Sequence, residues 1–554
     1  MRGRIFVVGL LLILSASGSW SPAAQPLPIP ASWLAVAYAK NIESAREFGT
    51  KLVGEVGSNQ AKLTHFISMV ASVLKPEAFG DGAFLFGVAE GSEAWPPFFA
   101  VCRPPSLDHL VEAYDGERVG ASGVIEVLGV PIVLTPIGDA VLMVLGESAE
   151  ASPDLTKAPV FLPVDQGTVG FSVSQRGLER MAESYSKRPA QDVRAARRQL
   201  RAANWSAPQL ATFSSVLTTS GPLWRELSAR SKGFRFYVDR LALDELQVVV
   251  QLDLQQARES DFASLAVPPV KNDQTTRLVA ANPGPLLQDL LALSLAYVES
   301  QPGLIEANQY DATAFSAYSD QLSAVASLVA RAEAIRMVPD EDQPVGAIGM
   351  MVLDVSQADV FMQQVHQLTQ TWNRLVNKSN GKTRLLFDAR DFASDDLRGV
   401  EFRCDLLTAF GIKQEPAMRK LMDRHVGNDG WQTFRVIRLP GERILVADAP
   451  LSQVLKRLGP PPEYNLPPAE SAAATEGANQ IAALSWSLDR YLAWLAAVRA
   501  IDGHRVIGAK QLVPMKPSPA VRVQLDGAEQ RVQLTIRIEP QTLRAYGAYC
   551  RQNQ

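Results

Sequence analysis

The 554-residue sequence contains few cysteines, and this limits what can hold the fold together. Its three cysteines, Cys102, Cys404 and Cys550, allow at most one bridge, so a disulfide-built fold is excluded. Cys102 and Cys404 both lie in apolar, strand-like runs, where a small buried thiol is the usual arrangement. We therefore predict that these two cysteines are buried and unpaired.

Histidine is also scarce, which limits metal sites and general-base catalysis. The five histidines are His65, His109, His366, His425 and His504. None lies one, two or four residues from another, and none has metal-ligand spacing to a cluster of Cys, Asp or Glu. We favour solvated or core histidines over a metal or catalytic site, and a site assembled from distant segments is the alternative.

The sequence motifs of several enzyme classes are missing. It has no Gly-x-Ser-x-Gly elbow, no Gly-x-Gly-x-x-Gly loop and no Walker sequence. Ser72 to Lys75 and Ser184 to Lys187 match Ser-x-x-Lys, but the accompanying elements of penicillin-binding enzymes are absent. The acidic run 388–396 lacks the glycine and closing glutamate of a calcium loop. We therefore predict no catalytic residues, no metal and no cofactor.

Charge and composition indicate a folded protein without a nucleic-acid partner. Hydrophobic residues make up 47% of the chain and charged residues 20%, with a net charge of -4. This near balance gives no strong positive field to attract nucleic acid. At about 150 residues per domain, the length suggests about three to four units.

The first 24 residues have the organisation of a secretory signal peptide. Arg2 and Arg4 precede an apolar run over 5–14, and small and turn-forming residues follow through Ala24. The run is about ten residues, shorter than the about 20 that span a bilayer. We predict a cleaved signal, no later membrane span, and a periplasmic or extracellular protein without a lipid anchor.

A strand followed by an amphipathic helix recurs along the chain. The pattern occurs at 33–39, 168–173, 277–281 and 481–486, with Ser174 as the expected N-cap of the second helix. Two β-hairpins are also predicted. Their turns are Gly138-Asp139, before a strand at 140–145, and Gly441-Glu442, before a strand at 443–447.

These hairpins carry a resemblance to a group of proteins. Gly129, the segment Gly138 to Val144 and, less closely, Gly441 to Val446 resemble exported bacterial proteins built from repeated strand-helix and Gly-Asp hairpin modules. The group has no assigned activity, so the resemblance implies no function for this chain.

The order of elements is similar in two halves, 30–265 and 275–545, which indicates an ancient duplication. The predicted fold class is α+β, with duplicated units whose mainly antiparallel sheets are covered by helices. The expected boundaries are a signal peptide at 1–24, α+β modules at 30–148, 165–265 and 275–458, a flexible Pro/Ala-rich insertion at 459–479, and a C-terminal strand-helix-hairpin module at 480–545.

One helical segment concentrates positive charge. Arg194, Arg197, Arg198 and Arg201 occur at i, i+3, i+4 and i+7, on one helix face. Such a face could bind another envelope protein or an anionic surface. We favour an ordinary solvated helix face, because the opposite positions form a modest packing surface.

Three functional hypotheses follow from these observations. The first is an exported, non-enzymatic scaffold or binding protein. The second is a periplasmic carrier of a lipid or other hydrophobic ligand, which requires a large cavity lined by Leu, Val, Phe and Met. The third is a hydrolase with a site assembled from distant segments, which requires a histidine within hydrogen-bond reach of a Ser, Asp or Glu in a cleft.

Overall fold

The structure is a computed structural model of the chain. It describes residues 27–39, 75–79, 83–90, 98–127, 129–145, 160–162, 169–187, 227–239, 245–255, 274–285, 287–288, 291, 312–337, 349–377, 387–394, 397–405, 431–448, 455, 480–493, 513, 515–528 and 530–552. The predicted signal peptide and the predicted insertion at 459–479 lie outside the described residues.

The described residues form 22 strands and fewer helices. The strands of the first half are β1 Leu27–Ile29, β2 Trp33–Ala39, β3 Phe84–Ala89, β4 Phe98–Cys102, β5 Glu117–Val119, β6 Ser122–Val127, β7 Val130–Ile137, β8 Ala140–Leu145, β9 Val160–Leu162, β10 Val169–Ser174, β11 Ser231–Asp239 and β12 Leu246–Leu254. Those of the second half are β13 Gln274–Ala281, β14 Val329–Met337, β15 Gly349–Val355, β16 Phe387–Ser394, β17 Leu397–Asp405, β18 Trp431–Leu439, β19 Arg443–Ala447, β20 Gln480–Trp486, β21 Val521–Ala528 and β22 Arg531–Ile538. The helices are α4 Pro76–Phe79, α5 Leu107–Ala113, α7 Gln175–Lys187, α12 Ala312–Ser327, α13 Ala358–Asn377 and α18 Pro540–Gln552.

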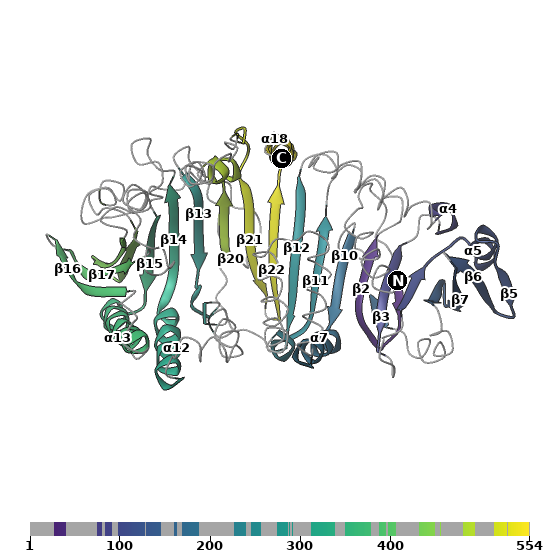
Figure 1. Cartoon of the computed structure of the whole chain (residues 1–554), viewed down its shortest axis with the longest axis horizontal. Helices are drawn as coiled ribbons and strands as arrows, with labels where there is room; N and C mark the ends of the chain where they lie inside the picture. Colours follow the sequence, from purple (N-terminus) through teal and green to yellow (C-terminus); the bar gives the residue numbers. More distant parts are fainter. Residues whose placement is uncertain are drawn as a thin grey trace, which may run out of the picture.

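One antiparallel sheet of 20 strands dominates the molecule (Figure 1). Strands β1 and β9 form a separate two-stranded sheet. Helices α7, α12 and α13 lie at one end of the strands in Figure 1, and α18 lies at the other end. No helix in the described part of the chain is long and apolar enough to cross a membrane.

The predicted fold class is wrong. The structure has one large antiparallel sheet with short helices near the strand ends, and not separate α+β units whose sheets are covered by helices. The difference arises because β12 and β22 pair along eight residues, from Leu246 opposite Ile538 to Asp253 opposite Arg531. Local sequence patterns do not reveal a pairing between segments so far apart in the chain.

The sheet has the same strand order in both halves, read outward from the centre. One half runs β12-β11-β10-β2-β3-β4-β8-β7-β6-β5, and the other runs β22-β21-β20-β13-β14-β15-β19-β18-β17-β16. The registers also correspond. Ser172 lies opposite Arg235 in one half, and Ser485 lies opposite Arg522 in the other. Positions in the two halves can therefore be equated strand by strand.

Both predicted hairpins are confirmed. Gly138 and Gly441 have φ angles of 61° and 77°, in the left-handed region that glycine adopts without strain. The acidic residue after each glycine ties its hairpin to an earlier segment, at or just before the start of a helix. Asp139 accepts from Arg103 Nε at 2.8 Å, and Glu442 accepts from the backbone N–H of Ala358.

The predicted N-cap of α7 is confirmed as well. Ser174 Oγ accepts from the backbone N–H of Gly177 at 3.0 Å and donates to the carbonyl of Trp33 at 2.9 Å. We expect Ser174→Ala to lower the free energy of unfolding by about 1 kcal/mol, because an unpaired helical N–H replaces this bond. Urea unfolding measures the change, with Ser316→Ala at an exposed position of α12 as the control. Equal losses in the two variants would contradict the capping role.

The cysteines agree with prediction where they are described. Cys102 is buried and forms no disulfide, and Cys550 is also free. Burial raises the pKa of the Cys102 thiol to about 12, so this side chain stays protonated and inert at neutral pH. The side chain of Cys404 lies outside the described residues.

The two faces of the sheet differ in chemistry at its centre. Alternate residues of a strand point to opposite faces. Gln251 and Thr535 point to one face and are buried, at 1% and 2% exposed. Val250 and Leu534, which pair with each other, point to the other face and are only half-buried. We call the second surface the apolar face.

Helices α12 and α13 pack against each other and shape this face in the second half. Phe361 and Val365 of α13 join a buried cluster with Leu353, Val436 and Ile444 of the strands. Met351 lies two residues from Leu353 on β15, and Val446 lies two residues from Ile444 on β19. Both are at the margin of this cluster and are half-buried. The apolar face therefore becomes more open away from the two helices.

Candidate functional site

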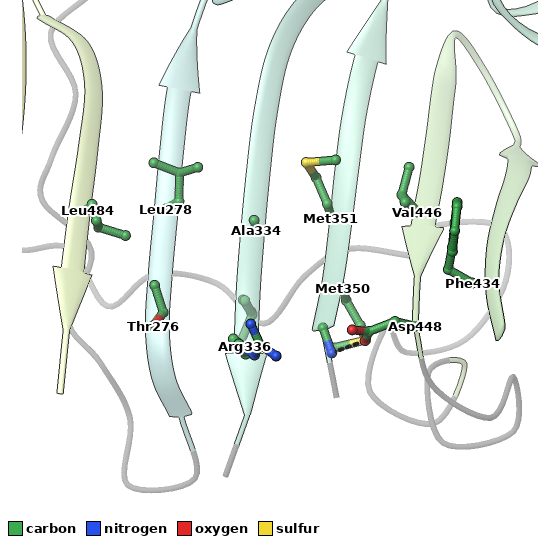
Figure 2. Close-up of a pocket in the computed structure, with 12 residues that line it drawn as sticks. Thr276, Leu278, Ala334, Arg336, Met350, Met351, Phe434, Val446, Asp448 and Leu484 are labelled. Carbon is green, nitrogen blue, oxygen red and sulfur yellow. Dashed lines mark hydrogen bonds between the residues drawn. The ribbon is translucent and has the colours of Figure 1, made fainter. Parts of the chain in front are cut away.

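A pocket of about 540 Å³ lies on the apolar face of the second half (Figure 2). This volume falls in the range that is typical of small-molecule sites. The residues that line it come from β20, β13, β14, β15, β18 and β19 or the residue after it: Thr276, Leu278, Ala334, Ile335, Arg336, Gly349, Met350, Met351, Phe434, Val446, Asp448 and Leu484.

An apolar row forms the middle of the pocket floor. Its members are direct partners on five neighbouring strands: Leu484, Leu278, Ala334, Met351 and Val446. Figure 2 shows their side chains side by side across the strands. Neighbouring strands lie about 4.8 Å apart, so this apolar row is roughly 19 Å long.

A polar row lies two residues further along the same strands. Thr276 pairs with Arg336, and Arg336 pairs with Gly349. The backbone N–H of Asp448 donates to the carbonyl of Gly349 at 3.1 Å, which extends the row by one strand. The pocket therefore has an apolar floor with a polar edge that contains one cationic and one acidic side chain.

Asp448 is held against the backbone of β15. Its carboxylate accepts from the backbone N–H of Gly349. A Cβ at position 349 would lie 2.9 Å from Asp448 Oδ1, so a larger residue there would force the carboxylate to shift. Burial raises the pKa of Asp448, and the Gly349 N–H and the charge of Arg336 only partly oppose this effect. The acidic group is half-buried, whereas Arg336 is exposed.

The two halves distribute large and small side chains differently at the positions of the pocket. Val446 and Met143 each lie five residues after a hairpin glycine, and they pair with Met351 and Ala100 respectively. The same register equates Ala334 with Phe86, which pairs with Ala100.

The strand register also equates the pair Arg336 and Gly349 of the second half with the pair Val88 and Phe98 of the first half. The rings of Phe86 and Phe98 stack with centroids 5.9 Å apart. The first half thus has two aromatic rings at the positions where the pocket has an alanine and a glycine.

A second charged cluster lies on β16, β17 and β18, outside the pocket. Glu401 is buried, and its carboxylate pairs with Arg435 Nη2 at 2.7 Å and with Arg390 Nε at 2.8 Å. Burial raises the pKa of Glu401, but the hydrogen bonds and charges of the two arginines outweigh burial and hold the pKa below its usual value. A carboxylate saturated by two arginines in this way is a stabilising element and is poorly suited to act as a base.

Of the arginines and histidines that the sequence singled out, the structure describes His109 and His366, and neither lines this pocket. Arg194, Arg197, Arg198 and Arg201 lie outside the described residues, so the arginine-face hypothesis stays a prediction. The same holds for His65, His425 and His504.

The two described histidines lie on helices. His109 is in the first turn of α5, where its backbone N–H donates to Ser106 Oγ at 3.0 Å. His366 Nδ1 lies 3.8 Å from Asp391 Oδ1, and both side chains are exposed, at 43% and 92%. In the part of the chain that the structure describes, no group of three or more His, Cys, Asp or Glu could hold a metal.

Sequence reasoning missed every pocket residue, because none belongs to a recognisable motif. Leu278 and Leu484 are ordinary strand residues about two hundred positions apart, and only the strand register makes them neighbours. The sequence carried one signal. β14 presents Ala332, Ala334 and Arg336 on one face, an unusual run of small side chains that ends in a charge.

No protein-family model, no curated protein and no solved structure matches this chain. The functional assignment therefore depends on the geometry of the pocket and on the chemistry of its lining.

Proposed function

We propose that this protein is an exported, non-enzymatic binding or carrier protein for a hydrophobic small molecule, which it holds in the pocket of the second half. The observation that carries the proposal is a space of about 540 Å³ on the accessible apolar face, with a floor of leucine, methionine and valine side chains. The carrier hypothesis required a cavity of this composition. A scaffold has no need for one.

Burial of ligand surface is the expected source of affinity. Each Å² of apolar area removed from water contributes roughly 25 cal/mol, and association costs offset part of the total. For a ligand that covers the apolar row, we expect a dissociation constant on the order of 10 µM or tighter. The half-buried state of Leu278, Met351 and Leu484 means that a ligand can still cover them.

Binding without catalysis is supported by the groups at the polar edge. Among the lining residues, Arg336 and Asp448 are the ones that carry a charge. The carboxylate of Asp448 accepts from a backbone N–H, and the described lining residues include one hydroxyl, that of Thr276, and no Ser, Cys, His or Lys as nucleophile or base. The lining therefore suits holding a molecule in place better than transforming it.

The proposal includes a duplicated origin for the two halves. The matching strand order and matching registers support this origin, and the pocket lies where the halves differ in side-chain size. One half then serves as a packed structural counterpart, and the other holds the ligand.

Titration with N-phenyl-1-naphthylamine, a neutral probe that fluoresces in apolar surroundings, tests the proposal. The mature protein should first be stripped of bound lipid. We expect saturable binding of one probe per chain, displaced by hexadecanol, and an adduct of matching mass by native mass spectrometry. A linear, non-saturating signal with no adduct would rule out the pocket as a binding site and return the scaffold hypothesis to first place.

A further inference from the structure

The arrangement of the pocket lining points to a class of ligand, and this step rests on the proposed function. The apolar row and the polar row run side by side across the same strands. Ala334 and Arg336 are two residues apart on one face of β14, so their Cα atoms are separated by roughly 7 Å. A molecule that lies over Ala334 can therefore place one polar end at Arg336 without leaving the floor.

We infer that the ligand is an amphiphile with a single long apolar chain and an anionic head group, carboxylate or phosphate, which Arg336 binds at the polar edge of the pocket. A guanidinium binds either anion through two parallel hydrogen bonds, which gives orientation as well as affinity. Arg336 lies beside the middle of the apolar row, so a chain that starts there can run over Ala334 and along half of the row, a path of roughly 16 Å. This path can take one acyl chain, because a chain in a bilayer spans about half of the 30 Å hydrocarbon core.

The two charged residues of the edge are not equally available to a ligand. Asp448 is half-buried, and its carboxylate is directed to the backbone of Gly349, as the dashed line in Figure 2 shows. Arg336 is exposed and lies between Thr276 and Gly349 in the polar row. Because the guanidinium is the more exposed of the two charged groups, a head group at the edge contacts it first, which favours an anionic head over a cationic one.

The comparison of the halves shows that space and charge occur together. The register equates Ala334 with Phe86, and Arg336 with Val88. In the first half these positions hold the phenyl ring of Phe86 and the apolar side chain of Val88. In the second half they hold the small side chain of Ala334 and the positive charge of Arg336. The open apolar row thus has a cation at its edge, and the equivalent place in the first half has none, which matches an amphiphile with an anionic head.

The experiment compares ligands that share a 16-carbon chain and differ in the head group. Hexadecanoate, hexadecyl phosphate, hexadecanol and hexadecyltrimethylammonium are tested as competitors of the neutral probe. The three charged compounds are used below their critical micelle concentrations and hexadecanol below its solubility limit. The proteins are the wild type, Arg336→Gln, and the control Arg331→Gln, which changes an exposed arginine on the opposite face of β14.

For the wild type, we expect at least one anion to bind about tenfold more tightly than hexadecanol. Arg336→Gln should remove this preference and leave hexadecanol unchanged, and Arg331→Gln should behave like the wild type. The ratio of the dissociation constants of hexadecanoate and hexadecyl phosphate identifies carboxylate or phosphate as the better head group.

Equal affinities for the anions and hexadecanol, or tighter binding of the ammonium compound, would overturn the head-group inference and leave the proposed function intact. The inference would also fail if the preference for the anion persisted in Arg336→Gln. Failure of all four ligands and of the neutral probe to bind would overturn the proposed function itself.

Discussion

Replacement of Ala334 by phenylalanine is expected to weaken binding of N-phenyl-1-naphthylamine by at least tenfold. Ala334 lies at the middle of the apolar row, between Leu278 and Met351. A phenyl ring at this position would occupy the space that a ligand needs. The variant should remain folded, because position 334 is half-buried on the open side of the sheet and the ring can extend into the pocket. Probe titration measures the affinity, and thermal unfolding measures the stability.

Val250→Phe is the matched control for this variant. Val250 is a half-buried residue of the same apolar face, and it lies on β12, outside the pocket. We expect its probe affinity to equal that of the wild type. If Ala334→Phe bound the probe as tightly as the wild type, or if both variants lost affinity equally, the probe would be binding elsewhere on the apolar face.

Substitution of Glu401 by glutamine is expected to lower the free energy of unfolding by about 3 kcal/mol at neutral pH, because it leaves two guanidinium groups without their carboxylate. The side chain of Glu401 is 5% exposed and that of Arg435 is 18% exposed, so solvent replaces little of the lost interaction. The more exposed Arg390 contributes less, and for this reason the expected value lies at the low end for a broken buried pair.

The loss of stability in Glu401→Gln should depend on pH in a defined direction. The pKa of Glu401 is lower in the folded protein than in the unfolded chain. The stabilisation is therefore present above the unfolded-state pKa, and it is lost as the pH falls through the folded-state pKa. In urea unfolding at pH 7, 5 and 3, the gap between the wild type and Glu401→Gln should narrow towards pH 3.

Glu183→Gln is the control for this charge effect. Glu183 pairs with Arg180 on α7, and both side chains are 43% exposed. Exposed pairs of this kind contribute up to about 0.5 kcal/mol, so this variant should be nearly as stable as the wild type. Similar losses for Glu401→Gln and Glu183→Gln would show that burial does not strengthen the Glu401 cluster.

The sequence predicted those elements that short-range chemistry determines. The hairpin turns at Gly138 and Gly441 require a positive φ, and the α7 cap requires a hydroxyl such as that of Ser174. Both signals lie within a few residues and are legible without the fold. The strands at 33–39 and 481–486 likewise match β2 and β20 to within one residue.

The arrangement of these elements was not predictable in the same way, and the reason is physical. A strand's alternation shows that it has two faces, but it does not show which face is buried. Gln251 looks solvent-facing by its polarity and is buried, whereas its neighbour Val250 keeps part of its surface exposed. The pocket depends on strand register as well, because Leu484 and Leu278 become neighbours only when β20 pairs with β13.

The pairing of β12 with β22 at the centre of the sheet also constrains how the chain folds. β12 lies near the middle of the chain, and its partner β22 ends at Ile538, close to the last described residue. In a chain synthesised from its amino end, the backbone N–H and C=O groups along one edge of β12 stay unpaired until nearly all of the polypeptide has been made. The outer strand β5 is short and carries Glu117 and Arg118, whereas β12 is long and rich in valine. The edge of β12, which is long and rich in valine, is thus paired late in synthesis, and the chain needs protection against self-association for the whole of that interval.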